Sequence, residues 1–268
     1  MTQNDDSDFV TAPRLFVDAT LAPDTTVTLG PEQTHYLLRV MRRPVGSVLA
    51  VFNGRDGLWQ ARIGGSDRRR ATLKIETQRE KQPTTEGPWL AFGIPKRPAL
   101  ETLLQKGTEL GVTRFIPVAT SRAITERINL DRLDRIVIEA AEQCERLDVP
   151  DVTPVWRLPD FLKEWPAERA LLWCDERGGG MPIADALDDL LGDDDDAPLP
   201  PWGLMIGPEG GFASTELDGL DELPFVTRVA LGPRVLRVDT AAIAALAIGQ
   251  ALAGDGDLQV RSAKWLNQ

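Results

Sequence analysis

The sequence is poor in metal-ligating residues and in long apolar runs. Its 268 residues include two cysteines, Cys144 and Cys174, and one histidine, His35. Two isolated cysteines form no CxxC pair and no disulfide framework, which predicts a reducing compartment and no metal site. No apolar stretch approaches the roughly 20 residues of a membrane-spanning helix, and residues 1–9 lack the basic and apolar regions of a signal peptide. We therefore expect a cytoplasmic protein that has no contact with a membrane.

Acidic residues outnumber basic ones, but unevenly along the chain. The formal net charge of −11 disfavours a protein that coats nucleic acid with its whole surface, because phosphate binding requires Lys and Arg. Residues 1–85 nevertheless carry 12 basic and 10 acidic residues, and arginines concentrate at 39–43 and 67–74. These arginines are either solvated surface or contacts to RNA, whereas the acidic run at 188–198 is typical of a solvated surface.

The first part of the chain has the pattern of a small β-barrel. From residue 15 to residue 77, short β-like runs alternate with turn residues. Asn53–Gly57 contains Asn-Gly and Asp-Gly pairs between two such runs, which predicts a hairpin. Residues 31–42 predict one short helix, with Thr34 as its candidate cap.

A change of pattern marks a second domain. The polar, proline-flanked segment 81–88 predicts a linker, so we expect one domain over residues 1–83 and another over 84–268. In the latter, strand-like and helix-like segments alternate, which predicts an α/β fold with a mostly parallel sheet and helices on both faces. Within 130–147, apolar residues recur at helical spacing and predict a helix whose apolar face is either core or a dimer surface.

A glycine-rich loop in the second domain has the pattern of a ligand site. Residues 204–214, LMIGPEGGFAS, lead from an apolar strand through the loop into a helix. Loops of this kind bind ligands in α/β folds because the N–H groups at the helix start are free. The loop lacks the Lys-Ser/Thr ending of a P-loop and the spacing of the dinucleotide fingerprint, and Glu209 would repel phosphate. The sequence therefore predicts a neutral or positively charged ligand.

A second segment has the same design. Residues 229–247 contain a strand, a Leu-Gly-Pro turn, two arginines and an alanine-rich helix, for which Asp239 or Thr240 is the expected N-cap. Two glycine-proline loops that follow neighbouring strands can form opposite walls of one pocket, since glycine lets the backbone approach closely. Such a pocket suits an adenosine.

Together with other segments, these loops resemble one known family over nearly the whole chain. The similar segments are HYLLRVMRRPVGSVLAVFNGRDG at 35–57, LLQKGTELGVTRFIPVATSR at 103–122, EAAEQCER at 139–146, IGPEGGF at 206–212 and LGPRVLRVDTA at 231–241. They resemble the RsmE family of ribosomal RNA uridine N3-methyltransferases, S-adenosylmethionine-dependent enzymes of the SPOUT class. The resemblance implies an N-terminal PUA-like β-barrel, a SPOUT-type trefoil knot in the last strands and helix, and a homodimer.

The resemblance also implies a cofactor and its site. S-adenosyl-L-methionine would bind among the knot loops, without a metal. The expected donor-binding residues are Leu172, with contacts that extend toward Asp175, then Ile206, Gly207, Pro208, Gly210 and Gly211, and then Leu231, Gly232, Leu236, Val238 and Thr240.

The chemistry of methyl transfer to N3 of uracil suggests candidate catalytic residues. The donor must be in line with the nitrogen, and negative charge develops on the ring as the N–H proton leaves. Arg237 is the first candidate to stabilise that charge and Arg234 the second, unless Arg237 only pairs with Asp239 or Glu209. Glu209 or Asp239 is a candidate proton acceptor. Alternatively, Glu209 bonds the loop amides or balances the sulfonium, and Asp239, where the family has Glu, is a helix cap.

The implied substrate is the 16S ribosomal RNA of the small subunit. The expected RNA contacts are Arg14, His35, Arg39, Arg42, Lys96, Arg122 and Arg146. Near the last of these, Glu145, Leu147 and Asp148 replace the Gly, Asn and Arg of the family. We expect an enzyme that methylates N3 of one uridine in 16S ribosomal RNA. The alternative is a catalytically silent SPOUT-fold factor for RNA binding or ribosome assembly.

Overall fold

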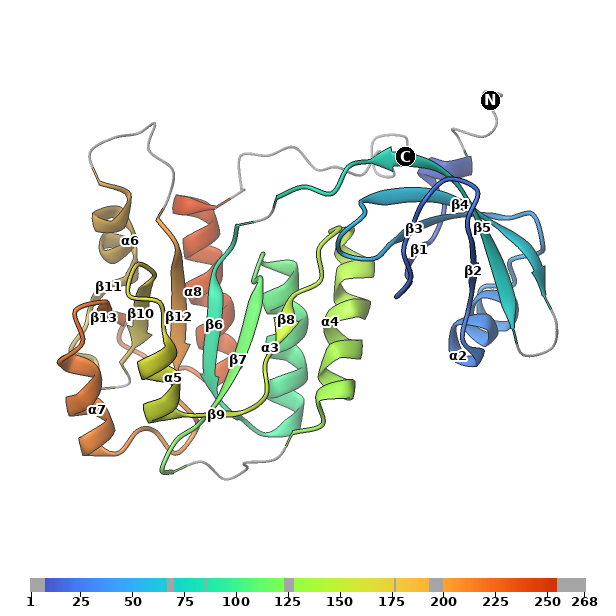
Figure 1. Cartoon of the computed structure of the whole chain (residues 1–268). Coiled ribbons are helices and arrows are strands. Elements are labelled where there is room, and N and C mark those ends of the chain that lie inside the picture. Colours follow the sequence, from blue (N-terminus) through green and yellow to red (C-terminus); the bar gives the residue numbers. More distant parts are fainter. Residues whose placement is uncertain are drawn as a thin grey trace. The chain divides into compact units, whose positions relative to one another are not determined.

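The computed structural model describes residues 8–66, 70–84, 86–122, 128–175, 177–192 and 200–254 (Figure 1). These residues form two compact units. The first contains the described residues up to Thr84 together with Ala141–Val149, and the second contains 86–140 and the described residues from Pro150 onward. Segment 141–149, which the sequence pattern placed in the second domain, groups with the N-terminal unit.

The first unit is built on a five-stranded sheet in the order β1-β3-β4-β5-β2. The strands are β1 (Arg14–Phe16), β2 (Thr26–Thr28), β3 (Val48–Phe52), β4 (Leu58–Ser66) and β5 (Ala71–Glu80). β1 runs parallel to β3, and the other pairs are antiparallel. Alternate residues in part of β4 and β5 are buried in the main apolar cluster of this unit, as the alternation along a strand predicts: Trp59, Ala61, Ile63, Ala71, Leu73 and Ile75.

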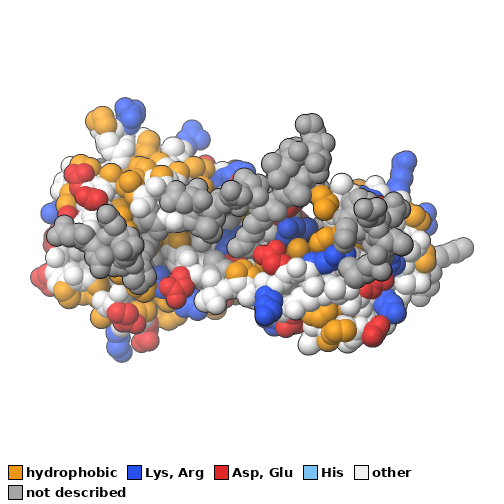
Figure 2. Space-filling model, turned by 90° about the horizontal axis from the view of Figure 1, so that it is seen from above, with side chains coloured by type: hydrophobic (Ala, Val, Ile, Leu, Met, Phe, Trp, Pro, Cys, Tyr) orange, Lys and Arg blue, Asp and Glu red, His pale blue; other side chains and the backbone are white. Residues whose placement is uncertain are grey.

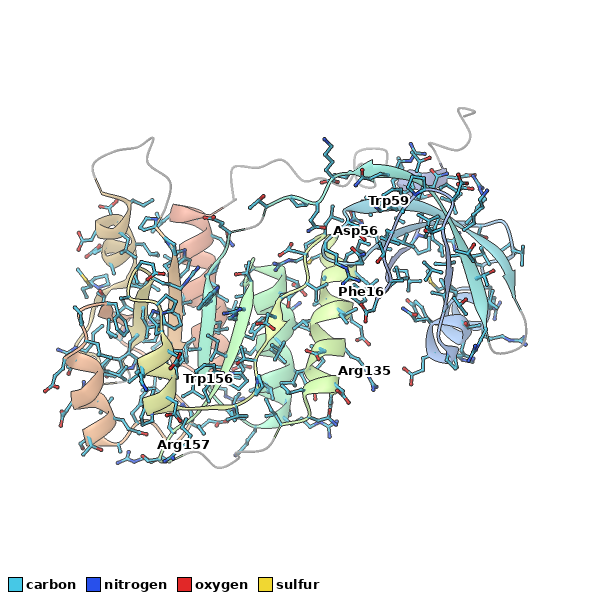
Figure 3. The ribbon with its side chains drawn as sticks, viewed as in Figure 1. Phe16, Asp56, Trp59, Arg135, Trp156 and Arg157 are labelled. Atoms are coloured by element: carbon cyan, nitrogen blue, oxygen red, sulfur yellow. The ribbon has the colours of Figure 1, made fainter. Side chains whose placement is uncertain are left out.

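The turn between β3 and β4 confirms the predicted hairpin. Asn53 Oδ1 accepts hydrogen bonds from the backbone N–H groups of Arg55 and Asp56, at 3.1 and 2.8 Å. The Asp56 carboxylate in turn accepts the N–H of Leu21 at 2.9 Å (Figure 3). That bond, and a second one from the Asn53 amide, hold the pKa of Asp56 below its usual value. The turn is thus fixed by side chains that the Asn-Gly-Arg-Asp-Gly sequence supplies.

The expected short helix is present, with a different start. α2 (Pro31–His35) follows the extended residue Gly30 and continues into one π-helical turn, η1 (Tyr36–Val40). Proline suits the first turn of a helix because its missing N–H has no partner there. Thr34 as the cap is therefore wrong: it lies inside α2, is buried, and its Oγ1 accepts the N–H of Ala71 at 3.0 Å.

A second apolar cluster within the first unit includes residues from segment 141–149. Its buried members are Ala12, Val48, Ala50, Phe52, Leu58, Ala141 and Leu147. Glu142 Oε1 accepts the N–H of Phe16 at 2.7 Å, and Arg14 forms an ion pair with Glu145 at 3.2 Å. These contacts explain why the segment belongs to this unit.

The second unit contains an eight-stranded sheet in the order β11-β13-β10-β12-β6-β7-β8, with β9 paired to β7. The strands are β6 (Trp89–Gly93), β7 (Arg114–Ala119), β8 (Asp151–Val152), β9 (Trp156–Arg157), β10 (Ala170–Cys174), β11 (Met181–Pro182), β12 (Trp202–Ile206) and β13 (Val226–Ala230). All of these pairs are parallel, which confirms the sheet predicted from the alternation of strands and helices.

Helices cover both faces of this sheet, as expected (Figure 1). They are α3 (Arg97–Glu109), α4 (Leu130–Cys144), α5 (Leu158–Glu164), α6 (Ile183–Leu191), α7 (Ser214–Asp221) and α8 (Val238–Ala253). On one face α5 and α7 contribute Phe161, Leu217 and Leu220 to a core that includes Trp173 of β10. On the other, α8 packs on β12 and against α3 and α6. None of the described helices has the length and apolar character needed to cross a membrane.

Candidate active site

The parallel strands of the second unit bring several loops to one edge of the sheet. β13, β10, β12, β6 and β7 lie side by side, and the loops that follow them leave from the carboxyl edge, the lower edge in Figure 1. Loops 207–213 and 231–237 are both at this edge. The expectation that they follow neighbouring strands is wrong, because β10 lies between β12 and β13. The opposite edge of the second unit shows interspersed basic and acidic side chains (Figure 2).

Loop 207–213 is held close to the sheet by a tight turn. Gly211 has φ +66° and donates its N–H to the Pro208 carbonyl at 2.9 Å. A Cβ on Gly93, the last residue of β6, would lie 2.4 Å from the backbone nitrogen of Pro208. Glycine at position 93 therefore permits the close approach of the loop to β6. This close approach buries Gly207 and Pro208.

The exposed tip of the same loop contacts the loops after β6 and β7. The backbone N–H of Lys96 donates to Glu209 Oε1 at 3.2 Å. A Cβ on Gly210 would lie 3.1 Å from the carbonyl oxygen of Arg122. Two residues expected to contact RNA, Lys96 and Arg122, are thereby next to the candidate catalytic residue Glu209 and the expected donor-binding residue Gly210. In the part of the chain that the structure describes, neither cationic side chain has a hydrogen bond or an ion pair.

The far end of loop 207–213 is anchored by Phe212 and Glu216. Phe212 is buried edge-to-face against Trp173, with ring centroids 6.0 Å apart. Glu216 in α7 accepts the N–H of Ala213 at 2.8 Å, and the N–H and hydroxyl of Ser121 at 2.8 and 3.0 Å. The Glu216 carboxylate thus links loop 207–213 to the loop that follows β7. Sequence analysis missed it, although an acid at the third position of a helix is a recognisable capping signal.

Loop 231–237 is open and cationic. Gly232 has φ +98°, and a Cβ there would meet only the Arg234 guanidinium, at 3.9 Å, so its backbone can be approached closely. Arg234 and Arg237 are exposed, and Val235 between them is 92% exposed. Among the described residues neither arginine side chain has an ion-pair partner. The alternative in which Arg237 only pairs with Asp239 or Glu209 is therefore not observed.

The start of α8 corrects the expected helix cap. α8 begins at Val238, with Arg237 at the N-cap position, so neither Asp239 nor Thr240 is the cap. The Arg237 carbonyl accepts the N–H of Ala241 at 2.8 Å, and Asp239 Oδ1 accepts the N–H of Thr240 at 3.0 Å. The Asp239 carboxylate thus lies in the first turn, where the free N–H groups of a helix stabilise negative charge.

Two of the expected RNA contacts are engaged in ion pairs of the first unit. Arg14 pairs with Glu145, and Arg146 pairs with Asp148. All four side chains are at least three-quarters buried. Glu145 and Asp148 are two of the three departures from the family pattern, and the third, Leu147, is buried in the second apolar cluster. The departures therefore have structural roles in this unit.

The remaining expected RNA contacts of the first unit lie on one short segment. His35, Arg39 and Arg42 are exposed on α2, η1 and the residues after them. Tyr36 and Val40 beside them are 47% and 60% exposed. The segment combines cations with an aromatic ring, the side chains that bind unpaired bases of RNA. The one tyrosine of the chain, adjacent to His35, was a signal that sequence analysis did not use.

A buried charge network lies at the end of β10. The Asp175 side chain is fully buried and forms ion pairs with Arg177 at 3.1 Å and Arg228 at 3.6 Å. Both arginines also pair with Asp221 of α7, at 3.6 and 3.1 Å. Burial acts to raise the pKa of Asp175, but the hydrogen bonds from Arg177 and the charge of Arg228 outweigh it and lower the pKa. The network joins the loop after β10 to β13 and α7.

The residues at this edge suit an adenosine-containing cation. Ile206 and Val238 are buried, while Leu231 and Leu236 are half-buried and provide further apolar surface. The glycine loops offer open backbone, and Glu209 places an exposed carboxylate beside them. Apolar surface, backbone amides and one negative charge match the adenine, ribose and sulfonium of S-adenosyl-L-methionine.

Comparison with known proteins identifies two families in the chain. Residues 85–250 match the RNA methyltransferase domain family, and residues 29–76 match the RNA methyltransferase PUA domain family. A relative from Rickettsia conorii named ribosomal RNA small subunit methyltransferase E is 30% identical, over 87% of this chain and 93% of the relative. The protein of the same name from Synechocystis is 34% identical, over 90% of this chain and 78% of the relative.

Solved structures agree with these matches. A ribosomal RNA small subunit methyltransferase E from Neisseria gonorrhoeae, bound to S-adenosyl methionine, has a TM-score of 0.77 at 30% identity and covers 91% of this chain and 99% of its own. A Legionella pneumophila protein in complex with the bound cofactor SAM also has a TM-score of 0.77, at 28% identity over 90% of this chain and 97% of its own. The chain therefore belongs to the ribosomal RNA small subunit methyltransferase E family and combines a PUA domain with an RNA methyltransferase domain.

Proposed function

We propose that this protein transfers a methyl group from S-adenosyl-L-methionine to N3 of one uridine in the 16S ribosomal RNA of the small subunit. The observation that carries the proposal is the position of Arg237, which is exposed and without an ion-pair partner among the described residues, in one of the two glycine-proline loops of the carboxyl edge. Membership of the family supports the reaction, and the name of the relatives supports the small-subunit RNA as substrate.

The donor would be held by residues of β10 and β12, by the loops that follow β12 and β13, and by the first turn of α8. We assign to it Leu172, Ile206, Gly207, Pro208, Gly210, Gly211, Leu231, Gly232, Leu236, Val238 and Thr240. When bound, S-adenosyl-L-methionine supplies a methyl group activated by the adjacent sulfonium. The apolar side chains exclude water from the adenosine, and the Glu209 carboxylate, fixed by the Lys96 N–H, balances the positive charge.

Arg237 would stabilise the reacting uracil. As the N3 proton leaves, negative charge spreads to the two ring carbonyl oxygens, and a guanidinium beside them lowers the free energy of the transition state. Arg234 is the second candidate for this role. Asp239 and Glu209 are the candidate proton acceptors, and Asp239 is in the same turn as Arg237.

Both domains would bind the RNA: a PUA-like barrel over residues 1–83 and a methyltransferase domain over 84–268. Exposed cations support this division of roles: His35, Arg39 and Arg42 in the first, and Lys96 and Arg122 at the carboxyl edge of the second. Arg14 and Arg146 are in ion pairs and would act on RNA only by exchanging those partners. An enzyme that acts on ribosomal RNA would work in the cytoplasm.

We also propose a trefoil knot and a homodimer. In the strand order β13-β10-β12, the chain goes from β12 past β10 before it forms β13. This crossing supports the proposed knot. The resemblance to SPOUT enzymes supports the dimer. Light scattering of the purified protein measures its mass, and a monomer at micromolar concentration would contradict that part of the proposal.

The deciding experiment is methyl transfer from labelled S-adenosyl-L-methionine to small ribosomal subunits that lack base modifications. We expect 3-methyluridine at one site by mass mapping. Arg237→Ala is expected to lower kcat by about 100-fold, the usual effect of removing one group that stabilises transition-state charge. Arg135→Ala is a matched control, because Arg135 in α4 is an exposed arginine without a charged partner among the described residues (Figure 3).

Calorimetry of donor binding separates the enzyme from a silent assembly factor. Binding without methylation of any ribosomal RNA would contradict the proposed reaction. Failure to bind S-adenosyl-L-methionine would overturn the assignment of the glycine loops as well.

A further inference from the structure

An open groove lies at the same edge of the sheet as the loops of the candidate active site. It has a volume of about 380 Å³ and is lined by Pro154, Val155, Trp156, Arg157 and Asp160. Strand β9, formed by Trp156 and Arg157, pairs in parallel with the last two residues of β7, Val118 and Ala119. The groove is therefore at the carboxyl edge of the sheet, as Figure 3 shows for the two labelled residues. Its volume falls in the range of pockets that hold small organic groups.

The lining of the groove combines an aromatic ring with a free cation. Trp156 is half-buried: it packs against the core beneath α5 and also lines the groove. Arg157 is exposed, and no hydrogen bond or ion pair of its side chain occurs in the described ranges. Asp160 lines the same groove but does not pair with Arg157. In a chain whose net charge is −11, an arginine that forms no ion pair with the described carboxylates is available to an anion.

Other cationic residues follow the neighbouring strands at the same edge of the sheet. Ala119, which pairs with Arg157, is three residues before Arg122, and Arg122 contacts the tip of loop 207–213. Lys96 follows the neighbouring strand β6 and contacts the same tip. The segments that contain Lys96, Arg122 and Arg157 are thus all at the carboxyl edge, where a polyanion could bind.

We propose that the groove binds one unpaired nucleotide of the RNA substrate, adjacent to the uridine that is methylated. The inference rests on the proposed function for the identity of the nucleic acid. The base stacks against Trp156, and Arg157 binds the phosphate or stacks on the other side of the base. The Asp160 carboxylate repels phosphate but accepts hydrogen bonds from the amino group of a base, so it orients the base into the groove and the backbone outward.

This subsite answers a physical requirement of the reaction. N3 of a uridine takes part in base pairing, so the target must be unpaired before its nitrogen can be reached. Stacking of the next base on the protein replaces part of the stacking that is lost when the RNA strand opens. Trp156 and Arg157 are thus positioning residues, since they hold the RNA and do not touch the reacting atoms.

The test compares full-length Trp156→Leu and Arg157→Ala with Arg135→Ala, on small ribosomal subunits that lack base modifications. Leucine keeps an apolar side chain against the core that Trp156 contacts, and thermal unfolding checks that each variant is folded. We expect Trp156→Leu and Arg157→Ala to raise KM for the subunit about tenfold, the usual effect of losing one stacked base. We expect kcat and the Kd for S-adenosyl-L-methionine to remain those of the wild type, and Arg135→Ala to change none of the three.

A second readout is photocrosslinking of the wild-type protein to single-stranded RNA, followed by mass spectrometry of the crosslinked peptide. A crosslink within 154–160 supports the proposal. Folded variants with unchanged KM, or crosslinks that avoid this segment, would overturn it. If the wild type methylates no ribosomal RNA, the proposed function fails, and the crosslink alone then decides whether the groove binds RNA.

Discussion

Asp175 illustrates how a single buried side chain can organise the edge of the sheet. Its carboxylate is fully buried and is bound by Arg177 and Arg228, while both arginines are partly exposed and pair with Asp221 as well. Removing the charge would leave two guanidiniums without their buried partner and loosen the loop after β10. The Asp175 charge therefore contributes more to the stability of the fold than a charge in an ion pair on the surface does.

We expect Asp175→Asn to lower the free energy of unfolding by about 2 kcal/mol at neutral pH. Urea denaturation measures the change. Asp151→Asn is the matched control, because Asp151 is 57% exposed and pairs with Arg114 at 3.0 Å; it is expected to cost less than about 0.5 kcal/mol. Equal losses in the two variants would contradict the special role of Asp175.

The pH dependence of this difference follows from the lowered pKa of Asp175. A carboxyl whose pKa is lower in the folded than in the unfolded protein stabilises the fold at pH values above its unfolded pKa, about 3.9, and loses this contribution as the pH falls through the folded pKa. The gap in stability between wild type and Asp175→Asn is therefore expected to be constant from pH 5 to 7 and to shrink below about pH 4. A gap that widened on acidification would exclude the mechanism.

At the level of elements, loop 207–213 depends on close packing against β6, which is the neighbour of the strand that the loop follows. The last residue of β6 touches the start of loop 207–213, and α7 holds the other end through Glu216. The loop is thus fixed before any ligand binds, which lowers the entropic cost of binding.

We expect Gly93→Ala to disturb the donor loop, since the new Cβ would lie 2.4 Å from the Pro208 nitrogen. The fold should lose about 1 to 3 kcal/mol, as in other overpacked sites, and the Kd for S-adenosyl-L-methionine should rise. Gly219→Ala in the interior of α7 meets no atom within 4 Å and is expected to stabilise the protein by about 0.5 to 1 kcal/mol. Calorimetry and thermal unfolding of both variants test the pair. A normal Kd in Gly93→Ala would show that the contact does not shape the site.

The strands and helices were largely predictable from the sequence, but the order in which the strands lie in the sheet was not. The hairpin at Asn53 and the parallel sheet follow from turn residues and from the alternation of strands and helices. That β10 separates β12 from β13 cannot be read from the chain, because sheet order is set by packing across the fold. The contact of Arg228 with Asp175 is invisible for the same reason. The donor-binding and RNA-binding residues remain predictions. The position of their loops at the carboxyl edge is consistent with these roles but does not test them.

On the scale of the whole molecule, the division into two units does not follow the chain. Residues 141–149 complete the second apolar cluster of the first unit. A linker can be recognised from composition, but a return of the chain to an earlier unit leaves no compositional signal. The first 84 residues alone therefore lack part of their own core.

We expect Leu147→Ala to lower the stability of the first unit, although Leu147 lies outside the N-terminal segment of the chain. Its side chain is 1% exposed, and such truncations cost about 2 to 5 kcal/mol. Hydrogen exchange should accelerate in β3, whose residues share the cluster. Leu220→Ala, at a fully buried position of α7, is the control and should accelerate exchange in the second unit while leaving β3 protected. Unchanged exchange in β3 of Leu147→Ala would contradict the division into units.

The discontinuous first unit also sets an order of events during synthesis of the protein. Val48, Ala50 and Phe52 need Ala141 and Leu147, which leave the ribosome only after residues 85–140. At about 5 to 20 residues per second, translation from residue 84 to residue 149 takes about 3 to 13 seconds. For that interval one apolar side of β3 lacks part of its native cover while strands of the second unit are already emerging. That side therefore stays partly exposed to solvent in the nascent chain, and a translational pause before codon 149 would prolong the exposure.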